Sequence, residues 1–186
     1  MKPNADVLIE TRHAPTTEGR LLTPATVTAV GGVVFAGAIF GFFYAWVCST
    51  MWGLDSIDPR AAITAMNGMN ASVRNGVFAP AFFGTPVALG ATALVALATG
   101  RRDLALLFGA AAGLYLAGAF AVTLVVNVPM NRALLAIEAP ADIEAARAIW
   151  TDYSSRWQGF NQLRTLVSGA VLLLTGWGLA RLRARP

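Results

Sequence analysis

The stretch LALLFGAAAGLYLAGAFAVTLVVNVPMN, residues 104–131, contains no charged side chain. Two other uncharged stretches, 21–54 and 75–100, are similarly long, and a shorter one covers 165–180. A helix needs about 20 apolar residues to cross the hydrocarbon core of a bilayer, so each of the first three stretches is long enough. Because 56% of the 186 residues are hydrophobic and only 13% are charged, the whole chain has the composition of a membrane protein.

This pattern predicts an all-α fold, a bundle of four transmembrane helices with short helical segments in the two extracytoplasmic connections. The four spans are expected near 24–50, 77–99, 104–127 and 160–181. Asp58-Pro59 is typical of a helix start and places the first outer helix near 59–74. Ala139-Pro140-Ala141-Asp142 places the second near 141–158, where it either ends before the last span or runs into it.

The distribution of basic residues predicts how the chain is oriented. Four spans put both ends of a single membrane domain, 23–186, on one side, together with a polar N-terminal tail, 1–22. We expect no cleaved signal peptide, because the first apolar run is too long for one. The turn at 100–103 has two arginines and the C-terminus has three, so the positive-inside rule makes this side cytoplasmic. We therefore expect a multi-pass protein of a bacterial inner membrane. Basic residues occur on both faces, so the net charge of +4 indicates contact with anionic lipids and no nucleic-acid binding.

An aromatic and polar stripe leads into the last apolar segment. At about 100° per residue its members lie within an arc of about 80° on one helix. The stripe consists of Trp150, Tyr153, Trp157, Asn161, Arg164 and Ser168. An arginine within a membrane is expensive and is a functional candidate by default. The alternative is an interfacial belt of aromatic side chains, which accounts for the rings but not for Asn161 and Arg164.

Further amides lie at the outer ends of the spans. Asn127 and Asn131 follow Thr123 at intervals of four, which favours one helix face, although Pro129 should distort this register. Asn67 and Asn70 share a face of the first outer helix, with Arg74 four residues further on. Capping amides and a solvated helix face are the alternatives to the wall of a polar pocket.

The sequence offers little for other kinds of chemistry. The only histidine, His13, lies in the polar tail, and no His, Cys or carboxylate cluster has metal-ligand spacing. No span holds Asp, Glu or Lys, which argues against an ion-driven transporter. Cys48 is the only cysteine, so no internal disulfide forms. A cap of amides, arginines and rings over an apolar bundle suits a flat, hydrophobic ligand that carries oxygen atoms.

Three motifs resemble those of the DUF1772 (anthrone oxygenase-like) membrane family. The first is AMNGMN at 65–70 with NGVF at 75–78, and the second is Val122-Thr123 with NVPMN at 127–131. The third comprises Trp150, Tyr153, Trp157, Asn161, Arg164 and Thr165. The resemblance implies a four-helix membrane protein, and named members oxidise anthrones to anthraquinones with dioxygen and without a known cofactor. Gln162 departs from the pattern, because many members have a histidine directly after the asparagine.

The resemblance and the residues together give a hypothesis for the site. Arg164 and Asn161 would stabilise a substrate oxyanion, and Tyr153 would shuttle a proton. Residues expected to bind a hydrophobic aromatic substrate are Trp150, Trp157, Asn127, Asn131, Asn70 and Asn67. We expect no metal and no cofactor.

A non-enzymatic membrane subunit is the competing hypothesis. The stripe would then dock a partner protein or a pigment, and the amides would cap helices. Small residues of the first and third spans, such as Gly41 and Gly113, would serve packing between molecules, in a homo-oligomer or with a partner membrane complex.

Overall fold

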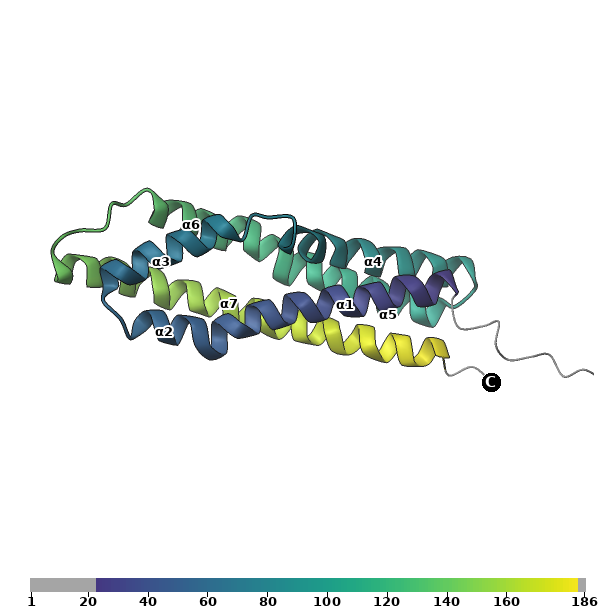
Figure 1. The fold of residues 1–186 in the computed structure, drawn as a ribbon. Coiled ribbons are helices and arrows are strands. Elements are labelled where there is room, and N and C mark those ends of the chain that lie inside the picture. Colours follow the sequence, from purple (N-terminus) through teal and green to yellow (C-terminus); the bar gives the residue numbers. More distant parts are fainter. Residues whose placement is uncertain (1–22, 184–186) are drawn as a thin grey trace, which may run out of the picture.

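The computed structural model describes residues 23–183, which form a bundle of long helices packed side by side (Figure 1). Four helices are long and apolar enough to cross a membrane: Pro24–Asp55, Phe78–Ala98, Arg102–Leu135 and Ile143–Arg183. The predicted all-α bundle with four spans is confirmed. Both ends of the described chain lie at the same end of the bundle (Figure 1). The predicted tail, 1–22, and His13 lie outside the described residues.

The described chain contains ten helical elements. In chain order they are α1 (Pro24–Ala45), η2 (Trp46–Thr50), α2 (Met51–Asp55), α3 (Pro59–Ser72), α4 (Phe78–Ala98), α5 (Arg102–Tyr115), η3 (Leu116–Ala121), η4 (Thr123–Asn127), α6 (Val128–Leu135) and α7 (Ile143–Arg183). The η elements are π-helical turns within the first and third long helices. They mark places where the regular hydrogen-bond ladder is interrupted.

The two outer helices can be compared with their predicted extents. The first outer helix, α3, occupies the predicted place, whereas the second is the start of α7, which continues without a break for 41 residues. At 1.5 Å per residue α7 is about 62 Å long, twice the roughly 30 Å of a bilayer core. The N-terminal part of α7, which carries Glu144, Arg147, Asp152 and Arg156, therefore extends past the hydrocarbon region.

Local sequence signals set the helix starts. The Thr23 hydroxyl caps α1 by accepting a hydrogen bond from the Thr26 amide at 3.2 Å, and Pro24 is the first helical residue. Asp58 does the same for α3, where its carboxylate accepts from the Arg60 amide at 2.9 Å and Pro59 follows the cap. Both caps satisfy amides that have no partner within the helix.

The half of the bundle that holds both described ends is called the terminal half (24–39, 84–98, 102–118 and 167–183); the opposite half is the distal half. The terminal half is close-packed and apolar. Gly178 lies against Phe108, so closely that a β-carbon there would come within 2.7 Å of the ring. Gly118 packs in the same way against Val167. These small residues let the helices approach each other closely.

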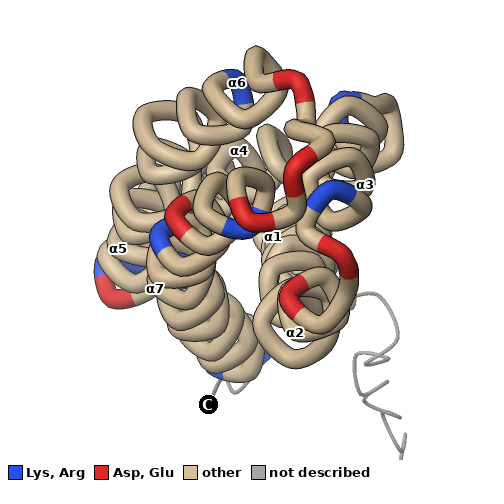
Figure 2. Tube along the Cα trace, turned by 90° about the vertical axis from the view of Figure 1, so that its left-hand side faces the viewer, with Lys and Arg blue, Asp and Glu red and all other residues tan. Residues whose placement is uncertain are grey.

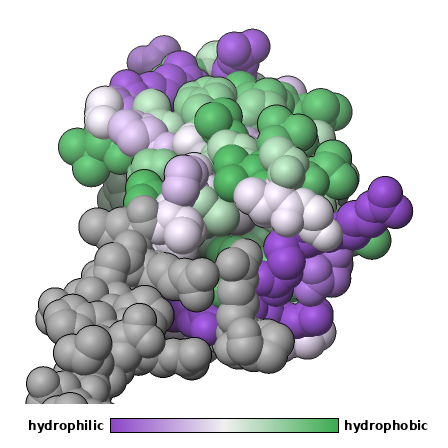
Figure 3. Space-filling view, turned by 90° about the vertical axis from the view of Figure 1, so that its right-hand side faces the viewer, coloured by the Kyte–Doolittle hydropathy of each residue, from purple (hydrophilic) through white to green (hydrophobic). Residues whose placement is uncertain are grey.

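The outer surface of the bundle is apolar along its length. Each long helix exposes large hydrophobic side chains, such as Val34, Val87, Leu106 and Leu173. Figure 2 looks onto the distal end of the bundle and shows charged residues on α2, α3, α6 and the start of α7. The terminal end shows hydrophilic residues beside the apolar helix ends (Figure 3). A wide apolar band between two charged ends is the surface of a multi-pass membrane protein.

Candidate functional site

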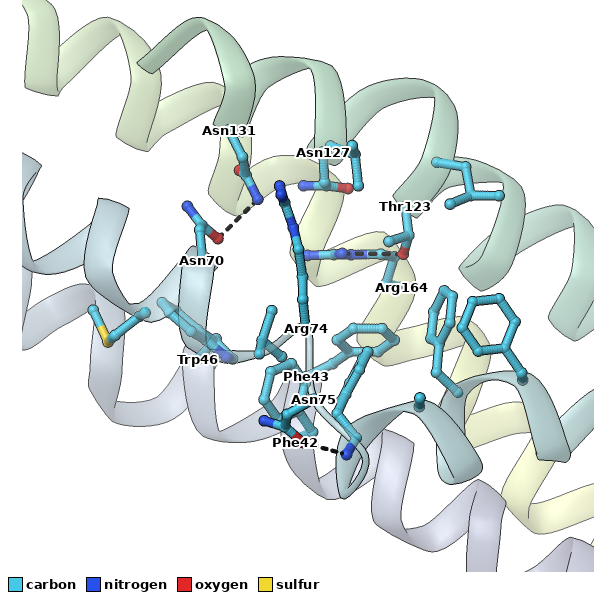
Figure 4. A pocket seen from close by; sticks show the side chains of 18 of the residues that line it. Phe42, Phe43, Trp46, Asn70, Arg74, Asn75, Thr123, Asn127, Asn131 and Arg164 are labelled. Carbon is cyan, nitrogen blue, oxygen red and sulfur yellow. Dashed lines mark hydrogen bonds between the residues drawn. The ribbon is translucent and has the colours of Figure 1, made fainter. Parts of the chain in front are cut away.

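A cavity of about 510 Å³ lies in the distal half, between α1, the α3–α4 connection, η4 and α7 (Figure 4). Seven aromatic side chains line it: Phe42, Phe43, Trp46, Phe78, Phe82, Phe83 and Trp157. Its polar lining comes from Asn70, Arg74, Asn75, Thr123, Asn127, Asn131 and Arg164. The volume and the mostly apolar wall are typical of a site for a small organic molecule.

Arg164 is buried on this wall, with only 4% of its surface exposed. Its guanidinium donates to the Thr123 hydroxyl at 3.1 Å and to the Asn161 carbonyl oxygen at 2.9 Å. The charged group lies 4.5 Å from the centre of the Phe43 ring and 5.2 Å from that of Trp157, within the range of cation–π attraction. No carboxylate among residues 23–183 pairs with it, and its Nε has no partner.

Asn161 holds this arginine in place from behind. Its side-chain amide donates to the Phe43 carbonyl at 3.1 Å, while its oxygen accepts from Arg164. The two residues are three apart on α7, so a regular helix brings them together. Asn161 is buried but does not line the cavity. It is therefore placed to orient Arg164 and not to touch a ligand.

Asn131 is the centre of a second hydrogen-bond network. Its carbonyl oxygen accepts from the Tyr153 hydroxyl at 2.8 Å and from the Trp157 indole at 3.0 Å, and its amide donates to the Asn70 oxygen at 2.8 Å. The network joins α3, α6 and α7, although these segments are far apart in sequence. Tyr153 lies one residue behind the cavity wall, because Asn131 stands between its hydroxyl and the cavity.

Several buried polar atoms of this half have no hydrogen-bond partner. Asn127 is 1% exposed, and both its amide nitrogen and its oxygen are unpaired. The amide nitrogen of Asn70 is also unpaired, as is Nε of Arg164. Unpaired buried polar groups are costly and rare in folded proteins. Three residues that line one cavity therefore have unused hydrogen-bonding capacity.

The π-helical turns position the third helix for this site. The turn η4 runs from Thr123 to Asn127, and α6 begins directly after it with Pro129 in its first turn. The sequence predicted a distorted register at this proline. Thr123, Asn127 and Asn131 nonetheless all line the cavity. Single π-turns within helices are frequent at functional sites.

Asn67 and Trp150 belong to other surroundings. The Trp150 indole donates to the Asp55 carboxylate at 2.9 Å, and the same carboxylate accepts from Ser154 at 2.7 Å and from Gln158 at 2.9 Å. Trp150 is thus held at the end of α2, and neither it nor Asn67 lines the cavity. Gln162 is exposed on the outside of α7, so a side chain at this position faces away from the cavity.

Some contributors to the site carried no clear signal in the sequence. Phe42, Phe43 and Trp46 read as ordinary residues of an apolar span, and their place on the cavity depends on how α1 packs on α7. Asp55 stood in a polar connection, and only the fold shows it bonded to three side chains of α7. The sequence placed Arg74 at the end of the first predicted outer helix, as a polar residue that could turn inward. In the structure it lies just after α3, and its side chain points into the cavity (Figure 4).

An apolar groove of about 430 Å³ adjoins the cavity between α1 and α4. The two share six lining residues: Phe42, Trp46, Met69, Val73, Asn75 and Phe78. The groove also reaches Val77, which is 88% exposed at the flank of the bundle. It connects the surroundings of the cavity with the lipid-facing side of the protein.

These features define a class: a multi-pass helical membrane protein with a ring-lined cavity. A buried arginine on the wall of this cavity has no carboxylate partner among residues 23–183. Within residues 23–183 no group of three His, Cys, Asp or Glu side chains is placed to bind a metal ion. The family model for anthrone oxygenase matches residues 77–174, which is more than half of the chain and includes Asn127, Asn131 and the stripe on α7. The chain belongs to the anthrone oxygenase family. No curated protein and no solved structure is significantly similar to it.

Proposed function

We propose that the protein oxidises a hydrophobic aromatic substrate of the anthrone type with dioxygen, without a metal or a flavin. The observation that carries this proposal is the buried Arg164, which faces an apolar, ring-lined cavity and has no carboxylate partner in the described chain. A positive group in such surroundings favours an oxyanion strongly, because little solvent screens the interaction. The family membership of the chain supplies the reaction class.

The chemistry needs few groups from the protein. Loss of a proton from the ring CH₂ of an anthrone gives an aromatic oxyanion, which Arg164 would stabilise, with Asn127 as a further donor. The ring carbon then forms a bond to O₂, and the resulting hydroperoxide loses water to leave the quinone carbonyl. One oxygen atom stays in the product and the other leaves as water, so the substrate supplies all the electrons. Trp157 and Phe43, which line the cavity, would flank the ring system.

The other predicted residues take supporting roles in this proposal. Asn161 orients Arg164, and Asn131 positions Trp157. Tyr153 is the proposed proton shuttle, acting from behind Asn131, to which its hydroxyl donates. The groove between α1 and α4 would let a lipid-soluble substrate reach the cavity from the membrane.

The test is aerobic incubation of the purified protein with emodin anthrone, following both quinone absorbance and oxygen uptake. We expect one O₂ consumed per quinone formed, at a rate well above that in buffer. Arg164→Ala should lower the rate at least about 100-fold, the usual effect of losing an oxyanion donor. Arg132→Ala is the matched control, because Arg132 lies on α6 outside the cavity. A wild-type rate equal to that of buffer or of Arg164→Ala would refute the proposal, and inhibition by chelators would refute its metal-free part.

One observation favours the alternative of a non-enzymatic subunit. A β-carbon built at Gly41 or at Gly113 would meet nothing within 4 Å. Both positions therefore have room for a helix of another molecule. Gly118, in contrast, is already used within the bundle. Purification in a mild detergent distinguishes the two hypotheses. A stoichiometric companion protein would favour the subunit, whereas an active monomer or homo-oligomer would favour the enzyme.

A further inference from the structure

Arg74 lies at the mouth of the cavity, in the connection between α3 and α4. Its side chain points into the cavity toward Asn127 (Figure 4). The guanidinium makes no hydrogen bond and no ion pair with any residue in the 23–183 range. Five other arginines of this range do pair with carboxylates: Arg60, Arg101, Arg147, Arg156 and Arg181.

The cavity therefore holds two positive charges and no negative one. Arg164 is deep and Arg74 is at the mouth, and no Asp or Glu of the described chain lines the space around them. A buried charge such as that of Arg164 is usually paired, since an uncompensated charge in apolar surroundings is costly. Arg74 is exposed to solvent at the mouth, so its charge is free to meet an incoming ligand. The missing partner is most simply supplied by the ligand.

Neutral hydrogen-bonding groups surround both arginines. Asn127 is almost fully buried, with both side-chain polar atoms unpaired, and the Asn70 amide nitrogen is likewise unpaired. Both residues line the cavity together with Arg74. An arginine combined with amide donors suits a carboxylate, which accepts two parallel hydrogen bonds from a guanidinium.

We propose that Arg74, Asn70 and Asn127 form a second subsite, which binds an ionised acidic group of the ligand. The inference rests on the proposed function in one respect, that the cavity holds a flat aromatic ligand. The ligand class is then an aromatic acid, with a carboxylate at the mouth and a carbonyl or hydroxyl oxygen at Arg164. The rings between the two ends lie against the aromatic wall.

The experiment compares the binding of two probes that share one ring system and differ in the charge of one group, a carboxylate and its methyl ester. Anthraquinone-2-carboxylate and its methyl ester are titrated by calorimetry into the full-length protein in a neutral detergent. We expect the wild type to bind the acid about tenfold more tightly than the ester, the size of one charge-assisted hydrogen bond. Arg74→Gln should abolish this preference and leave the affinity for the ester unchanged. The control Arg132→Gln should keep the preference, because Arg132 lies outside the cavity.

The possible outcomes separate this subsite from the oxidation chemistry. Equal affinities of the wild type for acid and ester, or a preference that survives Arg74→Gln, would overturn the subsite even if the anthrone is oxidised. A preference that depends on Arg74 would support it even if no turnover is found. Absence of binding by both probes would overturn it as well.

A lipid headgroup could supply the same negative charge. The titration is therefore repeated in nanodiscs of phosphatidylcholine, with and without phosphatidylglycerol. A preference for the acid that persists in both supports a subsite for the ligand. Its loss with phosphatidylglycerol would assign the positive charges to an anionic lipid and overturn the proposal.

Discussion

The two halves of the bundle treat buried polar groups in opposite ways. In the terminal half Thr92 and Thr175 each donate to a carbonyl one turn earlier, at 2.8 and 2.6 Å, and Tyr115 donates to the Phe82 carbonyl at 2.8 Å. In the distal half the side-chain atoms without a partner belong to Asn67, Asn70, Asn127 and Arg164. These buried polar groups of the terminal half are thus paired within the bundle, while several of the distal half have unpaired donors or acceptors.

Packing follows the same division. Glycines and rings fill the terminal half, as where Gly178 lies against Phe108. The distal half instead encloses a cavity and contains the π-helical turns η2 and η4. Such features lower stability and are kept where a site needs them. The contrast implies that equivalent substitutions should have different effects in the two halves, and also at paired and unpaired positions.

The largest difference in stability is expected between substitutions of two asparagines of the distal half. Asn161→Leu removes the bonds to the Phe43 carbonyl and to Arg164, and should lower the free energy of unfolding by about 3 kcal/mol. Asn127→Leu breaks no bond, and should leave stability unchanged or raise it by about 1 kcal/mol. Denaturant unfolding in mixed micelles measures both. Equal losses would mean that Asn127 is bonded in the membrane and would erase the contrast.

The sequence predicted the parts of this site that depend on one helix. Periodicity alone placed Trp157, Asn161 and Arg164 on one arc, and the bond between Asn161 and Arg164 follows from a spacing of three. Apolar runs predicted the four spans in the same way. The ends of these spans were harder to predict, because polar residues at the membrane boundary continue the helices. The first long helix thus ends at Asp55 and the third at Leu135.

Contacts between helices were beyond the reach of the sequence. Asn131 bonds Asn70 from 61 positions away, and Trp150 bonds Asp55 from 95 positions away. Periodicity gives the face of a helix but not the neighbour that this face meets. For this reason the sequence could predict Trp150 beside the substrate, although its indole is bonded to Asp55 and it does not line the cavity. Its substrate-binding role stays a hypothesis. The π-turns likewise depend on packing and leave no clear mark in the sequence.

The terminal half should be sensitive to the smallest increase in volume. Gly178→Ala would place a β-carbon 2.7 Å from the Phe108 ring and should cost about 2 kcal/mol, the usual range for overpacking. Gly176→Ala, one half-turn earlier on α7, meets nothing within 4 Å and should be neutral or slightly stabilising. Thermal unfolding in detergent compares the two. Equal melting temperatures would show that the terminal half is looser than its contacts indicate.

The carboxylate that links α2 to α7 should have a smaller effect. Asp55→Asn removes the charge that accepts bonds from Trp150, Ser154 and Gln158, and should cost about 1 kcal/mol. Indole fluorescence should shift as well, because Trp150 loses a charged partner. Asp152→Asn is the control: its pair with Arg156 spans 3.9 Å on the surface, so its loss should be nearly silent. Equal effects of the two variants would show that the Asp55 cluster adds no more than a surface ion pair.

The smallest effect is expected at the cap of α3, and it depends on pH. Hydrogen bonds from the Arg60 side chain and backbone lower the pKa of Asp58 from 3.8 to about 2. A carboxyl group whose pKa is lower in the folded state contributes stability above its unfolded pKa, and this contribution is lost as the pH falls from about 4 to 2.

Asp58→Asn still caps the helix but carries no charge, so its melting temperature should fall less between pH 5 and pH 2.5 than that of the wild type. Arg60→Gln should flatten the acid response in the same way, because Arg60 is the main cause of the shift. Since Asp58 is fully exposed, solvent screening keeps the difference small. An acid response as steep in Asp58→Asn as in the wild type would assign the loss of stability to other carboxylates.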